Sequence, residues 1–229
     1  MRRLSTIIFD LDGTLTDSAP AMTDALNAIW LAAGRAGFDA AAVRSFIGDG
    51  PAALIARARA ASGLADDAAL TRQETAAFMA AYAAGPGGAA YPGAAETLAA
   101  LRAAGFRLSV CTNKPQAAAE HLLAALGFAP YLAGVVGGDA TPRCKPDPAH
   151  VRAALALTPG AEPEEAVLVG DGPQDVAAAE AAGVAAIVAA YGYGGAATLR
   201  PDLPVIRSIR ELSDLLAGRS GAVAGGRRR

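Results

Sequence analysis

The chain has 229 residues, and its 20 basic and 22 acidic side chains give a formal charge of −2. This near-neutral balance argues against a nucleic-acid footprint, and no stretch reaches the roughly 18 uninterrupted apolar residues of a membrane span. Two cysteines in such a length also argue against a disulfide scaffold. We therefore expect a soluble, cytoplasmic globular protein without nucleic-acid or membrane partners. A monomer or a homodimer is expected, and the sequence does not distinguish the two.

The first predicted element is an apolar strand at 4–9, and a purely helical segment follows it. Helical patterns without a convincing strand between them occupy 19–33, 39–46, 51–61 and 68–84. A stretch rich in glycine and proline, 85–93, then connects to the rest of the chain. We expect residues 18–87 to form an all-helical domain inserted after the first strand. Inserts at that point lie over the crevice where α/β sheets bind ligands, so this one predicts a mobile cap.

Strands and helices alternate along the remainder of the chain. Short apolar runs rich in β-branched residues occur at 106–111, 134–136, 167–169 and 184–188. Helical stretches, several of which open at a proline and close at a glycine, occupy 94–104, 115–126, 148–157 and 173–182. This alternation is typical of a doubly wound, mostly parallel, Rossmann-like α/β sheet. We assign 1–17 and 88–216 to that core domain and expect 217–229 to be a disordered tail.

Two carboxylates directly follow the first strand, at the end where parallel sheets bind their ligands. Asp10 and Asp12 are two residues apart in extended chain, so both side chains face one small volume, and Gly13 allows close backbone approach. Adjacent carboxylates repel each other unless a cation or a shared proton stabilises them, which favours a hard metal such as Mg²⁺. The alternative is an ordinary solvated turn at the strand end.

Polar residues also follow two later strands. Thr112 and Asn113 come after the second strand of the core, just before a helix whose N-terminal N–H groups suit a phosphate. Asp171 follows a later strand, and Asp175 lies one helical turn further on. A proline-fixed loop between these segments carries Lys145. Because the carboxyl ends of parallel strands share one edge of a sheet, these groups predict a site for an anion and a metal.

Lysine usage points to the same segments. The chain has 20 basic residues, and its two lysines are Lys114 and Lys145, which leaves 18 arginines. Lysine presents a compact, strongly hydrated point charge, whereas arginine presents a wide planar fork. The placement of both lysines beside strand-end motifs therefore supports a binding role, with chance placement as the alternative.

Four ordered motifs carry a family resemblance: Asp10-Leu11-Asp12-Gly13-Thr14, Thr112-Asn113, Lys145-Pro146 and Gly170-Asp171…Asp175. In order and spacing they resemble the haloacid dehalogenase (HAD) superfamily over about residues 4–190, and the helical insert resembles its C1-type cap. Closer similarity to phosphoglycolate phosphatases comes from 10–18, 47–50, 112–115, 191–194 and 201–212. The chain departs from the pattern at Gly172, where many relatives have serine or threonine, and in its alanine-rich cap.

The resemblance implies a role for each matching residue. Asp10 would be the nucleophile that attacks phosphorus and forms an aspartyl-phosphate. Asp12 would protonate the leaving oxygen and then activate the hydrolytic water. Lys145, Thr112 and Asn113 would hold the phosphoryl oxygens. The cap would exclude water once substrate is bound.

The same resemblance implies a Mg²⁺ site and a substrate. Asp10, Asp171 and the backbone carbonyl of Asp12 would hold the metal, and Asp175 would hold a metal-bound water or orient Lys145. The reaction would be hydrolysis of a small phosphate monoester, 2-phosphoglycolate, to glycolate and phosphate. Alternatives on the same fold are a sugar-phosphate phosphatase, a pyrophosphatase and a β-phosphoglucomutase-like phosphomutase. The remote alternative is a non-catalytic binding protein.

The insert and the second motif offer further candidates for substrate binding. Phosphoglycolate carries a second anionic group, and Arg44 of the insert is a candidate partner for it, with an ordinary surface arginine as the alternative. Lys114 is a second candidate. Packing or surface roles are expected for His121, His150, Cys111 and Cys144.

Overall fold

A six-stranded sheet occupies the centre of the structure, a computed structural model that describes residues 4–195 and 200–221. Neighbouring strands all run parallel, in the order β5-β4-β1-β6-β7-β8. The strands are β1 (Thr6–Phe9), β4 (Arg107–Cys111), β5 (Val135–Val136), β6 (Ala166–Gly170), β7 (Ala185–Ala189) and β8 (Val205–Ile206). Two runs of strands extend from β1 in opposite directions, which makes the carboxyl end of β1 a topological switch point.

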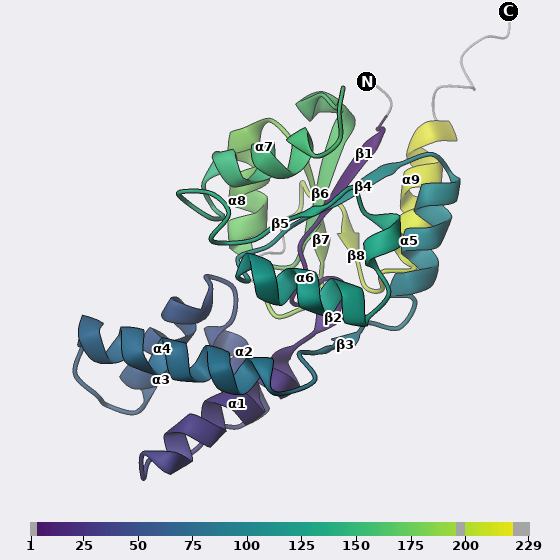
Figure 1. Cartoon of the computed structure of the whole chain (residues 1–229). Helices are drawn as coiled ribbons and strands as arrows, with labels where there is room; N and C mark the ends of the chain where they lie inside the picture. Colours follow the sequence, from purple (N-terminus) through teal and green to yellow (C-terminus); the bar gives the residue numbers. More distant parts are fainter. Residues whose placement is uncertain (1–3, 196–199, 222–229) are drawn as a thin grey trace, which may run out of the picture.

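Helices cover both faces of this sheet (Figure 1). One face carries α5 (Ala94–Ala103), α6 (Gln116–Ala125) and α9 (Glu211–Gly221), and the other carries α7 (Pro148–Ala156) and α8 (Pro173–Ala182). Successive strand residues alternate between the two faces: Ile7 and Phe9 belong to the first apolar cluster, whereas Ile8 belongs to the second. Both faces of the sheet are therefore dry, which explains the nearly continuous apolar strands.

The insert forms a separate layer beneath the carboxyl ends of the strands, next to α6 (Figure 1). Its helices are α1 (Ala19–Ala32), α2 (Ala40–Phe46), α3 (Pro51–Ala61) and α4 (Ala68–Ala83). They pack around a third apolar cluster that includes Trp30, Phe46, Ile55 and Phe78. The chain enters and leaves the insert through an antiparallel pair, β2 (Thr16–Asp17) and β3 (Ala89–Ala90).

The doubly wound parallel sheet predicted from the sequence is confirmed, and its predicted strands and helices end within two residues of the observed ones. The sequence pattern does not predict β2, β3 and β8, because two residues are too short to show an apolar alternation, nor does it predict the helix α9. It also missed two short 3₁₀ turns, Ala129–Tyr131 and Pro163–Glu165. None of these omissions lies in the central part of the sheet.

The predicted tail is wrong at its start, because α9 continues to Gly221 and so enters the segment 217–229. Leu212 and Leu216 anchor this helix on the first apolar cluster, which favours helix despite the glycines that follow. Residues 222–229 lie outside the described residues. No helix within the described ranges is long and apolar enough to cross a membrane.

Candidate active site

Segments far apart in the sequence meet at the carboxyl ends of the strands. Asp10 follows β1, and Thr112 and Asp171 follow the two strands on either side of it. The loop before α7 brings Lys145 to the same edge. A pocket between sheet and insert is lined on the sheet side by Asp10, Asp12, Thr112, Asn113 and Lys114. The apolar lining from the insert includes Met22, Ile47, Leu54, Phe78, Met79 and Tyr82.

Three buried carboxylates form a cluster at this edge. Carboxylate oxygens of Asp10, Asp171 and Asp175 all lie within 4.8 Å of one another. Burial raises the pKa of Asp10 well above its ordinary value, although Lys145 opposes that shift. Burial, together with the neighbouring Asp175, raises the pKa of Asp171 to about 7. Negative charge that is both crowded and removed from water in this way is stabilised by a cation.

One lysine lies inside the carboxylate cluster. Lys145 Nζ donates to Asp10 Oδ1 at 2.7 Å and to Asp175 Oδ1 at 2.5 Å, and its side chain is 1% exposed. Burial acts to lower the pKa of Lys145, but Asp10 and Asp175 outweigh burial and raise that pKa above its ordinary value. The ammonium group therefore stays charged, yet a single positive charge does not balance three carboxylates.

The carboxylate oxygens of the cluster suit a hard divalent cation. Asp171 is fixed at both oxygens, since Oδ1 accepts from Thr14 Oγ1 at 3.1 Å and Oδ2 accepts from the Tyr193 N–H at 2.6 Å. Gly13 allows the close approach: its φ is +90°, and a Cβ there would lie 2.4 Å from Asp171 Oδ2. Carboxylate oxygens are the ligands that Mg²⁺ prefers, so Asp10, Asp171 and Asp175 fit the predicted metal.

The side chain of Asp12 lies apart from this cluster. Lys114 Nζ donates to both carboxylate oxygens of Asp12 at 2.9 Å, and Ser18 Oγ donates to Oδ1 at 2.5 Å. Asp12 therefore has a positively charged partner of its own, although Asp10 and Asp12 both line the pocket. The Asp12 side chain is not among the three carboxylates whose oxygens converge.

Lys114 also joins the sheet to the insert. Its Nζ lies 4.7 Å from the centre of the Tyr82 ring, which belongs to α4. Burial acts to lower the pKa of Lys114, and the charge of Asp12 and the nearby Tyr82 reverse this and raise it. Both lysines of the chain are thus buried cations at the strand-end site.

Asn113 connects loops and does not present a free amide to the pocket. Its Nδ2 donates to Lys145 O at 3.0 Å and to Gly48 O at 2.9 Å, while its Oδ1 accepts from the Lys145 N–H at 3.0 Å. The predicted contact between the Asn113 side chain and phosphate is therefore corrected, because both ends of the amide are engaged. Thr112 is buried in the pocket wall, and its Oγ1 accepts from the Lys114 N–H at 3.2 Å.

Two predicted contributors are engaged elsewhere. Arg44 Nη2 lies 3.4 Å from Asp17 Oδ2, and the arginine side chain is 47% exposed. Arg44 is not among the described residues that line the pocket, so its predicted contact with substrate has no geometric support. The N–H of Gln116, at the start of α6, donates to Asp139 Oδ1 at 2.7 Å and is not free for a phosphate.

His150 has a larger part in the site than the sequence analysis gave it. It is fully buried, its Nδ1 accepts from the Lys145 N–H at 3.0 Å, and its Nε2 lies 3.1 Å from Gly137 O. Burial and the charge of Lys145 lower the pKa of His150, which keeps the ring neutral with the proton on Nε2. The sequence predicts a packing role for His150, and the one signal for a larger role is its position five residues after Lys145, as the third residue of α7.

Tyr193 is a second residue whose contribution only the structure reveals. Its backbone N–H holds Asp171, and its hydroxyl donates to Asp17 Oδ1 at 2.7 Å while accepting from the Ser18 N–H at 2.8 Å. Tyr193 therefore links the carboxylate cluster to the start of the insert. The sequence signal is the segment 191–194, in which each of two tyrosines is followed by a glycine.

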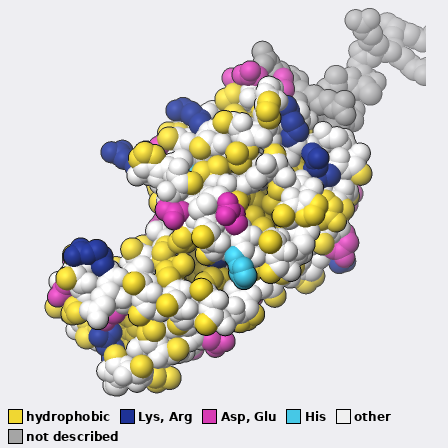
Figure 2. Space-filling view, viewed as in Figure 1, with side chains coloured by type: hydrophobic (Ala, Val, Ile, Leu, Met, Phe, Trp, Pro, Cys, Tyr) yellow, Lys and Arg dark blue, Asp and Glu magenta, His cyan; other side chains and the backbone are white. Residues whose placement is uncertain are grey.

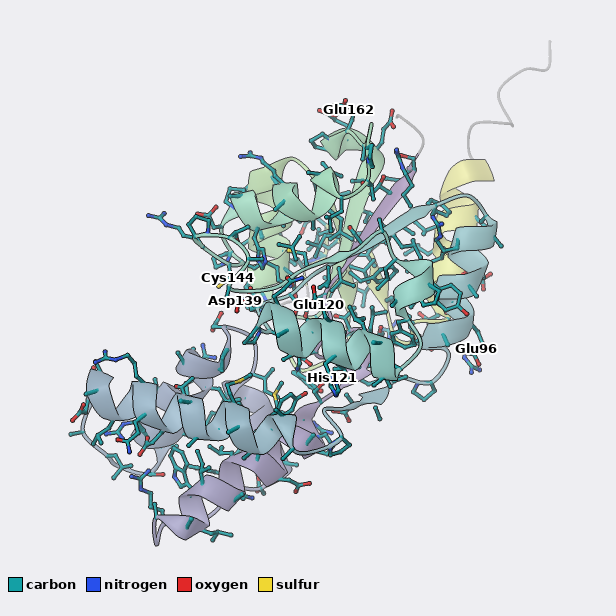
Figure 3. All side chains as sticks on the ribbon, viewed as in Figure 1. Glu96, Glu120, His121, Asp139, Cys144 and Glu162 are labelled. Carbon is teal, nitrogen blue, oxygen red and sulfur yellow. The ribbon has the colours of Figure 1, made fainter. Side chains whose placement is uncertain are left out.

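The other histidine lies away from the carboxylate cluster. His121 is exposed on α6, and together with Met79, Tyr82 and Leu122 it lines a mostly apolar groove beside the insert (Figure 3). A histidine surrounded by hydrophobic side chains is visible in the hollow between sheet and insert in Figure 2. Burial raises the pKa of Cys111 to about 12, which suits a packing residue.

Comparison with known proteins extends over most of the chain. The family model described as haloacid dehalogenase-like hydrolase matches residues 4–183. A phosphoglycolate phosphatase of Rhodospirillum rubrum is 50% identical over 193 residues, which are 82% of this chain and 80% of that protein. Two solved structures agree in fold. A predicted phosphoglycolate phosphatase from Haemophilus somnus 129PT gives a TM-score of 0.85 at 28% identity, covering 94% of this chain and 99% of its own. CbbY from Rhodobacter sphaeroides in complex with phosphate gives a TM-score of 0.77 at 26% identity, and the match covers 91% of this chain and 96% of CbbY.

Proposed function

The chain belongs to the haloacid dehalogenase-like hydrolases, and we propose that it is a Mg²⁺-dependent phosphatase that converts 2-phosphoglycolate to glycolate and phosphate. The observation that carries the proposal is the buried cluster of Asp10, Asp171 and Asp175 around Lys145, beside a pocket at the switch point of the sheet. The name of the relative in Rhodospirillum rubrum supports the choice of substrate.

The first chemical step uses Asp10 and Asp12. An Asp10 carboxylate oxygen attacks phosphorus in line, the bond from phosphorus to the ester oxygen breaks, and an aspartyl-phosphate forms. Protonated Asp12 gives its proton to the departing ester oxygen, so glycolate leaves with a neutral hydroxyl group. The two aspartates thus take different parts, and their separate partners, Lys145 and Lys114, suit that division.

The second step returns the enzyme to its starting state. Asp12, now a carboxylate, accepts a proton from a water molecule as the water oxygen attacks phosphorus. The bond from phosphorus to the Asp10 oxygen breaks, which regenerates the Asp10 carboxylate and releases phosphate. The apolar wall that the insert contributes limits the entry of further water during both steps.

The charged groups around Asp10 serve the phosphoryl group. A Mg²⁺ ion held by Asp10, Asp171 and Asp175 would supply positive charge that offsets repulsion between these carboxylates and the phosphoryl oxygens. Lys145 holds the attacking carboxylate through its 2.7 Å hydrogen bond to Asp10 Oδ1, and it adds a fixed positive charge beside the reacting phosphorus. His150 and Asn113 hold the backbone of this lysine.

A screen of phosphate esters with and without Mg²⁺ tests the proposed function. We expect the highest kcat/KM for 2-phosphoglycolate, lower values for sugar phosphates and pyrophosphate, and no turnover after chelation. A phosphomutase would need polar groups for a second sugar hydroxyl, whereas the insert lines the pocket mainly with apolar side chains. Absence of hydrolysis of every ester, or full activity in chelator, would contradict the proposal.

The variant Asp12→Asn separates acid–base catalysis from metal binding. We expect kcat to fall by about 10²–10⁴-fold, since the amide cannot exchange a proton with the ester oxygen or the water. Mg²⁺ affinity should change little, because the Asp12 carboxylate faces Lys114 and not the carboxylate cluster. Steady-state kinetics and calorimetric titration with Mg²⁺ measure the two effects. Loss of Mg²⁺ binding in this variant would assign Asp12 to the metal site through its side chain.

The variant Arg44→Ala tests the candidate in the insert. Arg44 faces Asp17 and is half exposed. We therefore expect kcat/KM to change by the same small factor for 2-phosphoglycolate and for 2-phosphoglycolamide, in which an uncharged amide replaces the carboxylate. Kinetics with both esters give the comparison. A selective loss for 2-phosphoglycolate would restore Arg44 as a partner of the substrate carboxylate.

A further inference from the structure

The proposed substrate has two negatively charged ends, and the pocket offers few cations for them. Its phosphoryl group belongs at Asp10, beside Lys145. Its carboxylate needs a second cation, because a buried carboxylate without a partner is strongly destabilised. Lys114 is the one lysine or arginine among the described residues that line the pocket, whereas the insert lines it with apolar side chains.

The covalent structure of the substrate places its carboxylate near Lys114. The ester oxygen of 2-phosphoglycolate must touch Asp12 in order to receive a proton there. The carboxylate carbon is two bonds from that oxygen, and Lys114 Nζ already lies 2.9 Å from both oxygens of Asp12. The substrate carboxylate, which is that close to the ester oxygen, can therefore reach the ammonium group of Lys114. A leaving group that is uncharged, or whose charge is further from the ester oxygen, places no anion next to Lys114.

The surroundings of Lys114 hold its ammonium group in place for such a contact. The side chain is 3% exposed, and the Tyr82 ring lies 4.7 Å from Nζ on the insert side. The ring attracts the cation without supplying a negative charge, so it leaves the lysine available to an arriving anion. Asp12 is its sole carboxylate partner among the described residues.

We propose that Lys114 determines specificity for 2-phosphoryloxy carboxylates, by turning part of its hydrogen bonding from Asp12 to the carboxylate of the bound substrate. The proposal rests on the proposed phosphatase function. In the substrate-free protein Lys114 donates hydrogen bonds to Asp12, and in the complex it donates to the substrate carboxylate as well. The enzyme then recognises the carboxylate at the same position where it protonates the leaving oxygen.

The test compares 2-phosphoglycolate with its neutral amide, 2-phosphoglycolamide, which has nearly the same shape. For the wild type we expect a higher kcat/KM with 2-phosphoglycolate. Lys114→Gln should lose about 10- to 100-fold more kcat/KM with 2-phosphoglycolate than with the amide, the usual effect of losing one charge-assisted hydrogen bond. Lys114→Arg should keep a preference for the carboxylate, since it keeps the charge. Arg72→Gln, which removes an exposed positive charge elsewhere on the insert, is the matched control and should leave the preference unchanged.

The outcomes separate the two proposals. If the wild type hydrolyses neither ester, or does not prefer 2-phosphoglycolate, the proposed function fails whatever Lys114 does. If the wild type prefers 2-phosphoglycolate and Lys114→Gln keeps that preference while losing activity on both esters equally, Lys114 is structural and the inference is overturned. Circular dichroism melts establish that each variant is folded. If Lys114→Gln is unstable, the ratio of kcat/KM for the two esters is measured with Lys114→Arg instead. An arginine variant with no carboxylate preference would also contradict the inference.

Discussion

Replacing Asp10 with asparagine is expected to abolish turnover and to leave the protein folded. The amide is a far weaker nucleophile than the carboxylate, so the loss should be on the order of 10⁴-fold or more. The same change removes one of three crowded negative charges, and burial already disfavours the charged form of Asp10. We therefore expect the melting temperature of the metal-free protein to stay the same or rise. Hydrolysis of 2-phosphoglycolate and circular dichroism melts measure the two effects.

A matched control uses an aspartate far from the carboxylate cluster. Asp66 is exposed in the insert, and Asp66→Asn makes the same chemical change without touching the site. Its activity should equal that of the wild type. Activity of Asp10→Asn within about tenfold of the wild type, with this control unaffected, would remove Asp10 from the role of nucleophile.

Lys145→Arg is expected to lose activity although it conserves the charge. The lysine side chain is 1% exposed, and its Nζ lies between oxygens of Asp10 and Asp175 at 2.7 and 2.5 Å. A guanidinium group is wider and favours two parallel bonds to one carboxylate, so it must displace at least one of these aspartates. Small displacements at a reacting centre cost about 10²-fold, which sets the minimum loss in kcat/KM at saturating Mg²⁺.

Two further variants show whether the charge or the shape of the Lys145 side chain causes the loss. Lys145→Ala should be worse than Lys145→Arg, because it leaves Asp10 and Asp175 without their ammonium partner. Arg143→Lys makes the reverse exchange in the same loop at a side chain that is 81% exposed, and it should leave kcat/KM unchanged. Nearly full activity in Lys145→Arg would mean that only the charge of this lysine matters, and the geometric argument would fail.

The sequence predicts where the site lies because strand ends are easy to locate. Asp10, Thr112 and Asp171 each follow a short apolar run, and buried parallel strands place such positions at one edge. The scarcity of lysine was a second signal, since Lys114 and Lys145 both became buried cations of the site. Both signals depend only on local sequence pattern and on composition, so they can be recognised before the fold is known.

Side-chain partners were harder to predict, because they depend on loops that meet across long stretches of sequence. Asn113 has the expected position, but its amide bonds the backbone of Lys145 and of Gly48 in the insert. Asp12 is next to Asp10 in sequence, yet its partner Lys114 is 102 residues away. No periodicity in the sequence shows which lysine pairs with which aspartate, so the separate partners of Asp10 and Asp12 are seen only in the structure.

In the proposed reaction, phosphate passes through a covalent bond to Asp10, and chemical trapping of that bond is a direct test. Borohydride reduces an acyl-phosphate to an alcohol, so a sample quenched during turnover of 2-phosphoglycolate with Mg²⁺ should carry homoserine at position 10. Peptide mass spectrometry locates the modification, and enzyme treated without substrate provides the blank. We predict homoserine at position 10 in the turnover sample alone. Undiminished turnover with no homoserine there, or with homoserine at position 12 instead, would contradict a covalent intermediate on Asp10.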